Sequence, residues 1–329
     1  MKTKIIAITM GEPGGIGPEV IVKALHRADI RKCCTPFVIG DAEIMRNAVK
    51  LTGLPFKIRT ISNPSQLKPA KGRIEVLDIK YHAPFITGAS SKNAGRAVVS
   101  YIKKAVELAL KNEVSAIVTA PISKASLKMA GYKWPGHTEL LASLTKTKDF
   151  AMMFVSDRLK IILCTIHIPL KDVPGKINEK VILKTIRLAK RGAGMSGLKD
   201  PCIGVAGLNP HAGESGIIGR EEIRSIIPAI KIAVKEGTNV TGPYPPDVIF
   251  HKAFNGAFDL VVCMYHDQGL IPFKMLAFDT GVNVTVGLPI IRTSPDHGTG
   301  FDIAWKNKAN PSSMIEAIKL AAKLKNRDG

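Results

Sequence analysis

The chain has 329 residues, of which 45% are hydrophobic, and a formal net charge of +20. This length fits about two domains or lobes with a substantial core. The basic residues are spread along the chain and aromatic residues make up only 5%, which argues against the stacking platforms of nucleic-acid-binding proteins. We therefore expect no nucleic-acid partner, and we expect the positive field to attract small anions such as phosphate esters and dinucleotides.

No apolar run approaches the roughly 20 residues of a membrane helix, and the apolar stretch at residues 5–9 is too short for a signal peptide. The five cysteines are odd in number, and three of them lie in apolar, strand-like runs, where cysteine behaves as a small hydrophobic residue. The sequence thus predicts a cytoplasmic protein with no membrane contact, disulfide framework or cysteine zinc site.

Apolar runs of strand length alternate with segments of helical period along the whole chain. Strands are predicted at residues 5–9, 37–40, 74–78, 116–120, 151–155, 159–165, 202–206, 260–264 and 282–286, and helices at 18–28, 94–110, 178–191, 221–235 and 311–324. This βαβ rhythm predicts an α/β fold. No linker divides the chain, so we expect two lobes that share a continuous or interlaced sheet, approximately residues 1–120 with 260–329, and residues 121–259.

Three histidines each follow an apolar, strand-like run: His167, His211 and His266. Open α/β sheets bind ligands at the carboxyl ends of their strands, so the three imidazoles could meet at one sheet edge. There they could hold a divalent metal with coordination positions left open, as catalytic sites do. A single histidine after a strand is more often a hydrogen-bonded loop residue, and it is the joint pattern that favours a metal site.

Two loops join a strand to a helix in a way that suits an anion. Residues 11–19 are rich in glycine, and the amino terminus of the following helix favours an anion, although a tight turn explains the glycines equally well. The loop matches neither the dinucleotide fingerprint nor the P-loop. His137 and Thr138 open another helix and are plausible contacts to an anionic ligand, while helix capping alone would also explain Thr138.

Three polar residues near the carboxyl end of the chain point to the same ligand class. Asn283 lies in a strand-like run and Arg292 follows the apolar residues 288–291, where an unpaired polar group would be costly to bury. Arginine suits a bidentate grip on a carboxylate or phosphate. Lys274 completes this set, and the alternative is a solvated lysine with a salt-bridged arginine.

Five motifs together resemble the 4-hydroxythreonine-4-phosphate dehydrogenase family, and the match runs from Ile5 to the last helix. They are residues 11–19, 135–139, 209–214, 265–269 and 292–300. Residues 16–19 and 297–311 are more distantly similar to isopropylmalate and isocitrate dehydrogenases. The resemblance implies a two-lobed α/β/α fold with the active site in the cleft between the lobes, a non-Rossmann site for NAD or NADP, and a homodimer with shared active sites.

The resemblance also implies residue roles. The metal ligands are His167, His211 and His266, which would hold one zinc, magnesium or cobalt ion. The substrate contacts are His137, Thr138, Lys274, Asn283 and Arg292. The residues that face NAD(P) are Asp296, His297, Gly298, Thr299, Asp302 and Asn310.

The implied reaction oxidises a hydroxyl group β to a carboxylate, and the resulting β-keto acid loses carbon dioxide. The expected substrate is 4-phosphohydroxy-L-threonine, the precursor of 3-amino-2-oxopropyl phosphate in pyridoxal phosphate biosynthesis. Residues 139–141 and 301–305 look closer to the branch that converts 4-phospho-D-threonate or 4-phospho-D-erythronate to dihydroxyacetone phosphate. Asp247 or Asp267 could be the base or orient a ligand histidine, and Lys274 could donate a proton. A metal-dependent hydrolase and an acyltransferase remain rival classes.

Overall fold

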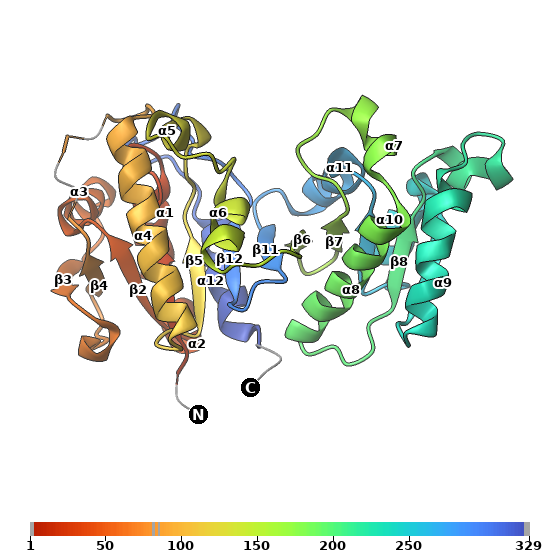
Figure 1. Ribbon diagram of the computed structural model, residues 1–329. Coiled ribbons are helices and arrows are strands. Elements are labelled where there is room, and N and C mark those ends of the chain that lie inside the picture. The colour runs from red at the N-terminus through yellow and green to blue at the C-terminus, as the bar shows by residue number, and fades with distance from the viewer. Residues whose placement is uncertain (1–2, 81–82, 85, 326–329) are drawn as a thin grey trace. The chain divides into compact units, whose positions relative to one another are not determined.

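The computed structural model describes residues 3–80, 83–84 and 86–325, and the chain forms two compact α/β units (Figure 1). Unit 1 comprises Met1–Lys148 and Leu288–Lys323, and unit 2 comprises Asp149–Gly287 and Leu324–Gly329. The α/β class predicted from the sequence is confirmed. The observed divisions lie further along the chain than residues 120 and 259, because the helices that follow the strand at residues 116–119 still pack on unit 1.

The strands of unit 1 lie in the order β3-β4-β2-β1-β5-β12, and all neighbouring pairs are parallel. Strands β1 and β5 are buried along nearly their whole length, as expected when helices cover both faces of a parallel sheet, and this explains their unbroken apolar sequences. The strands are β1 (Ile5–Thr9), β2 (Thr35–Gly40), β3 (Lys57–Ile61), β4 (Arg73–Asp78), β5 (Ala116–Thr119) and β12 (Arg292–Pro295).

The helices of unit 1 begin and end at recognisable signals. In α3, the Asp41 side chain accepts hydrogen bonds from the first turn and Gly53 ends the helix in the left-handed conformation. Helix α4 approaches α5 so closely that a Cβ atom on Gly95 would lie 2.1 Å from the Ser126 carbonyl oxygen. The helices are α1 (Gly17–His26), α2 (Ala28–Cys33), α3 (Ala42–Thr52), η1 (Pro64–Gln66), α4 (Lys92–Leu110), α5 (Lys124–Met129), α6 (His137–Leu144) and α12 (Ser312–Lys323).

The strands of unit 2 lie in the order β11-β6-β7-β10-β8-β9. The pairs β11/β6 and β6/β7 are antiparallel, whereas β7, β10, β8 and β9 run parallel. Strand β10 is central and fully buried. The strands are β6 (Ala151–Val155), β7 (Lys160–Leu163), β8 (Ile203–Ala206), β9 (Val240–Tyr244), β10 (Leu260–Cys263) and β11 (Val282–Val286).

Helices pack on the sheet of unit 2 around a core that includes Phe154 and Phe273, whose rings meet edge to face at a centroid distance of 5.8 Å. None of the helices in the described ranges is long and apolar enough to cross a membrane. The helical segments are η2 (Leu170–Asp172), α7 (Val173–Lys176), α8 (Glu179–Met195), η3 (Pro210–Gly216), η4 (Glu222–Ile226), α9 (Ile227–Lys235), α10 (Pro246–Phe254) and α11 (His266–Ala277).

Candidate active site

The three predicted metal ligands follow three adjacent parallel strands of unit 2. His167 follows β7, His266 follows β10 and His211 follows β8, and β10 pairs with both of the other strands. Parallel neighbours end at the same edge of a sheet, so the topology gathers the three loops there, at the edge where α/β sheets bind ligands.

Two of the three imidazoles lie side by side. The ring centroids of His167 and His266 are 5.6 Å apart. The Nδ1 atom of His266 lies 2.6 Å from Oδ1 of Asp267, the arrangement that commonly orients a ligand histidine and leaves its Nε2 atom for a metal. His211 is exposed on its own loop, and no three His, Cys, Asp or Glu side chains in the described residues form a group that could hold one ion.

Buried side chains tie the three loops together. The Thr165 hydroxyl donates to the Met264 carbonyl oxygen at 2.8 Å, which joins the loops after β7 and β10. The Gln268 amide donates to the Gly207 carbonyl oxygen at 2.7 Å and accepts from the Met264 N–H at 2.7 Å. This second link joins the loops after β10 and β8. Sequence reasoning missed both residues, although Gln268 lies within a recognised motif.

The loop that carries His211 has an unusual backbone. Residues 211–215 all have positive φ angles, between 42° and 82°, and only Gly213 among them is a glycine. The left-handed conformation costs roughly 1–2 kcal/mol per non-glycine residue. Such strain persists only where the surrounding structure imposes it, and it concentrates at functional sites.

One of the predicted anion contacts, Arg292, is a buried cation in unit 1. Arg292 is only 2% exposed, and its Nε and Nη2 atoms donate to the Thr119 hydroxyl at 3.1 and 2.7 Å. Burial lowers the pKa of Arg292 to about 9, while the carboxylate of Glu139 acts in the opposite direction. Burial, and then the charge of Arg292, holds the pKa of His137 well below its usual range.

His137 and Thr138 open α6 as the sequence predicted. The Nε2 atom of His137 is shielded from solvent and has no hydrogen-bond partner among the described residues, whereas the ring donates a hydrogen bond to the Ala120 backbone. A buried polar atom without a partner calls for an explanation such as a ligand. The buried guanidinium of Arg292 makes the region at the end of β5 suitable for an anion, and the Nε2 atom of His137 can contact the same ligand.

The other predicted catalytic and substrate residues lie in unit 2. Lys274 lies in α11 with its Nζ atom 5.7 Å from the centre of the Phe278 ring. Asn283 is 7% exposed within β11, opposite Phe154 of β6. Asp247 is exposed in the first turn of α10, where a carboxylate also stabilises the helix end. Their roles stay predictions.

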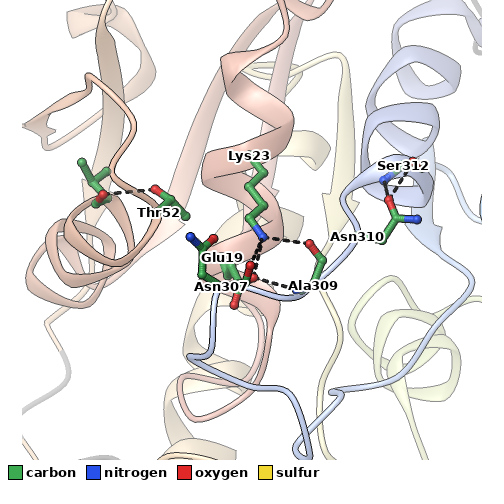
Figure 2. Close-up of polar contacts among 8 residues, drawn as sticks. Glu19, Lys23, Thr52, Asn307, Ala309, Asn310 and Ser312 are labelled. Atoms are coloured by element: carbon green, nitrogen blue, oxygen red, sulfur yellow. Dashed lines mark hydrogen bonds and ion pairs between the residues drawn. The ribbon is translucent and has the colours of Figure 1, made fainter.

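The residues expected to face NAD(P), 296–300 with Asp302 and Asn310, belong to a segment that is anchored to α1 and to the connection before it. Figure 2 shows Lys23 reaching the carbonyl oxygens of Asn307 and Ala309, at 3.1 and 3.0 Å, beside the buried carboxylate of Glu19. Glu19 also accepts from the Ala309 N–H at 2.8 Å. At the other end of the loop, the Ile16 N–H donates to the Thr299 carbonyl oxygen at 2.9 Å.

Several predicted nucleotide contacts have local structural roles as well. The Asn310 side chain accepts from the N–H and the hydroxyl of Ser312, at 3.0 and 2.7 Å, at the start of α12. The Asp296 N–H donates to the Ser313 hydroxyl at 2.9 Å, and a ring nitrogen of His297 lies 3.1 Å from the Gly298 carbonyl oxygen. Asp302 is exposed, and its carbonyl oxygen accepts from Lys306.

The glycine-rich connection at residues 11–19 is a tightly packed turn. A Cβ atom on Gly11, which has a φ of +76°, would lie 2.5 Å from the Pro121 carbonyl oxygen, and one on Gly17 would lie 2.4 Å from that of Met10. The buried Glu12 carboxylate accepts from the Ser126 hydroxyl at 3.1 Å and from the Ser123 N–H at 3.4 Å. Burial raises the pKa of Glu12 to about 7.

Comparison with known proteins identifies the family. The model of the pyridoxal phosphate biosynthetic protein PdxA matches residues 32–321. The chain belongs to this family. It is 47% identical to a 4-hydroxythreonine-4-phosphate dehydrogenase of Desulforapulum autotrophicum over 97% of this chain and 94% of that protein. It is 46% identical to a D-threonate 4-phosphate dehydrogenase of Cupriavidus necator over 98% of each chain.

A solved structure of 4-hydroxythreonine-4-phosphate dehydrogenase from Klebsiella pneumoniae has the same fold. Its TM-score is 0.89 at 43% identity, over 97% of this chain and 98% of that chain. The family and these relatives identify the chain as a dehydrogenase that acts on a CH–OH group. The rival hydrolase and acyltransferase classes are therefore set aside.

Glu12 predicts a pH-dependent stability for this PdxA-family chain. The folded protein holds a proton that the unfolded chain loses, because the pKa of Glu12 rises from 4.5 to about 7 on folding. The contribution of Glu12 to the free energy of unfolding therefore falls as the pH rises from about 4.5 to about 7. We expect the free energy of unfolding of Glu12→Gln to rise relative to that of the wild type by on the order of 1–3 kcal/mol across this pH range.

Urea unfolding at several pH values between these limits measures the effect. The matched control is Glu43→Gln, which alters an exposed carboxylate of the same unit. A stability difference between Glu12→Gln and the wild type that stays constant with pH would contradict the prediction.

Proposed function

We propose that the chain is a metal-dependent, NAD(P)-linked dehydrogenase that oxidises and decarboxylates a 4-phosphorylated 3-hydroxy acid. The preferred substrate in this proposal is 4-phosphohydroxy-L-threonine, which gives 3-amino-2-oxopropyl phosphate for pyridoxal phosphate synthesis. The observation that carries the proposal is the alignment with dehydrogenases of phosphorylated substrates at 46–47% identity over 97–98% of the chain. A cytoplasmic location, predicted from the sequence, is part of the same proposal.

A second substrate has comparable support, because the relatives named D-threonate 4-phosphate dehydrogenase have nearly the same identity as the others. This alternative oxidises 4-phospho-D-threonate or 4-phospho-D-erythronate and gives dihydroxyacetone phosphate. A panel of the three substrates, at fixed metal and cofactor, separates the two by the rate of NAD(P)H formation. Formation of NAD(P)H with none of the three would contradict the proposal.

The binding of the substrate's anionic groups is assigned to unit 1. Arg292 is a buried cation, and His137 presents a buried nitrogen without a partner. A guanidinium in a low-dielectric environment binds a phosphate or carboxylate through charge-assisted hydrogen bonds. Burial also keeps His137 neutral, so this ring can position an oxygen atom without adding charge. Thr138 completes the proposed contacts of unit 1, and Lys274 and Asn283 are proposed as substrate contacts in unit 2.

The proposed metal ligands are His167, His211 and His266. The rings of His167 and His266 lie 5.6 Å apart, and Asp267 orients His266 through the Nδ1 atom of that ring. Nitrogen donors with a carboxylate behind them suit zinc or cobalt, and magnesium is the oxygen-preferring alternative. A divalent ion supplies a Lewis acid that polarises a hydroxyl oxygen and stabilises negative charge on it.

Proton transfer and hydride transfer complete the proposed chemistry. Asp247 and Asp267 are the two candidates for the base that takes the proton of the hydroxyl group. Lys274 donates a proton to the carbon that loses carbon dioxide. NAD or NADP would supply the hydride acceptor, and the residues that would hold it are Asp296, His297, Gly298, Thr299, Asp302 and Asn310.

The proposal includes a homodimer. The described part of α11 and the residue after it expose large apolar side chains, namely Ile271 (60%), Met275 (82%) and Phe278 (72%). Exposed apolar patches of this kind mark protein interfaces. Because α11 begins at His266, a partner subunit on this helix would lie next to a proposed metal ligand, in agreement with a shared active site.

Removal of His211 tests the metal site. We expect His211→Ala to lose tight binding of one divalent ion per chain while it keeps its fold, because a two-histidine site lacks the third ligand. Elemental analysis after gel filtration gives the metal content. His251→Ala, which removes an exposed histidine of the same unit, is the control and should bind metal normally. Unchanged metal content in His211→Ala would exclude this ligand.

Substitution of Arg292 tests the anion contact. Arg292→Lys keeps the charge but loses the planar fork. We expect kcat/KM for the phosphorylated substrate to fall roughly ten- to a hundredfold, which corresponds to a loss of about 1.5–3 kcal/mol of transition-state stabilisation. The fall should be much smaller with a substrate that lacks the phosphate. Arg59→Lys, at an ion pair of the same unit, is the control. Equal losses with both substrates would argue for a purely structural arginine.

The dimer interface is tested by a charge on α11. We expect Met275→Asp to sediment as a monomer and to lose activity, because a buried unpaired carboxylate opposes association. Leu170→Asp is the control, since Leu170 is also an exposed apolar residue, at 67%, but lies outside α11. If the Met275→Asp protein were fully dimeric, the interface would lie outside α11.

A further inference from the structure

A buried carboxylate contacts the left-handed loop that carries His211, and the half-buried Glu221 beside it also accepts from the Asn209 amide, at 2.8 Å. Glu222 lies at the start of η4 and is only 2% exposed. Its Oε1 atom accepts from the N–H groups of Leu208 and Asn209, both at 2.8 Å, and its Oε2 atom accepts from the Asn209 side-chain amide at 2.9 Å. One side chain thus satisfies three donors immediately before the loop.

Glycines allow the carboxylate to lie inside the loop. A Cβ atom on Gly213 would lie 2.6 Å from Oε2 of Glu222, and one on Gly207 would lie 3.2 Å from Oε1. The same Gly207 atom would lie 2.9 Å from Cα of Ala212. Both sides of the loop therefore close around Glu222, and neither glycine leaves room for a larger residue.

The position of this contact in the chain connects it to the metal site. Residues 208 and 209 come directly before the loop and Gly213 lies in its middle, so Glu222 contacts the chain on both sides of His211. Gly207 is also the residue whose carbonyl oxygen accepts from Gln268. The hydrogen bonds of Glu222 therefore fix the loop relative to the chain segment that carries His266.

We propose that Glu222 is a positioning residue, which holds the left-handed loop in place and thereby directs His211 toward a divalent cation. The proposal rests on the metal site proposed above. Glu222 contacts the loop and no reacting atom, so it acts through His211. A strained loop that is released relaxes toward ordinary backbone conformations, and the imidazole then leaves its position.

Glu222→Gln is the direct test, since it keeps the shape of the side chain and removes the charge. One amide oxygen can accept from the two backbone N–H groups, but the new NH2 group then faces the Asn209 amide donor. We expect faster hydrogen exchange in residues 208–216 of the full-length protein. We also expect the dissociation constant for Mn²⁺ or Zn²⁺, measured by calorimetry, to rise by roughly ten- to a hundredfold.

The matched control is Glu236→Gln, which alters an exposed carboxylate of the same unit that pairs with Arg187. It should change neither measurement. A purely structural role for Glu222 would lower the melting temperature without a change in metal affinity, and that result would overturn the proposal. Metal affinity that falls while exchange in residues 208–216 stays at the wild-type rate would also overturn it.

A second variant keeps the test decisive if Glu222→Gln does not fold. Gly213→Ala leaves the carboxylate intact but places a Cβ atom against it, at a backbone φ of +82°, and we expect the same two changes. His211→Ala separates this proposal from the one on which it rests. If His211→Ala binds metal as the wild type does, the proposed assignment of the metal site is wrong. If His211→Ala loses metal and neither loop variant does, only the role of Glu222 is wrong.

Discussion

Parallel pairing of β10 with both β7 and β8 is the constraint on which the placement of the three histidine-bearing loops depends. It brings three loops that are far apart in sequence to one edge of the sheet in unit 2. Strand pairing alone cannot fix side chains that lie several residues beyond the strand ends. Thr165, Gln268 and Glu222 supply the further hydrogen bonds, and each is buried, so each bond is made away from competing water.

The two units carry different chemistry. Unit 1 holds a buried guanidinium, a neutral imidazole and an anchored loop, to which the proposal assigns an anion and a nucleotide. Unit 2 holds the imidazoles and the carboxylate that orients one of them. This division agrees with the proposed reaction, in which the anionic groups of the substrate must be bound while a separate hydroxyl is oxidised.

The sequence predicted those parts of the fold that have a strong local pattern. The helix expected at residues 94–110 is α4, and the buried strand before His266 is β10. Strand β12 was missed because its residues, Arg292 to Pro295, are polar in composition and become buried only through partners such as Thr119. Glu222 falls within the helix predicted at residues 221–235, but its contacts could not be predicted, since its donors lie 13 and 14 residues earlier in the chain. Side-chain contacts of this range leave no periodic signal in a sequence.

The most direct test of this account is a crystal structure of the dimer grown with Zn²⁺ or Co²⁺, with the ion located by anomalous scattering. The account predicts one ion per chain, bound by the imidazole nitrogens of His167, His211 and His266 at about 2.0–2.2 Å. It also predicts that residues 211–215 keep their left-handed backbone and that Glu222 keeps its contacts with Leu208 and Asn209. An ion bound elsewhere, or one bound without His211, would contradict the central claim.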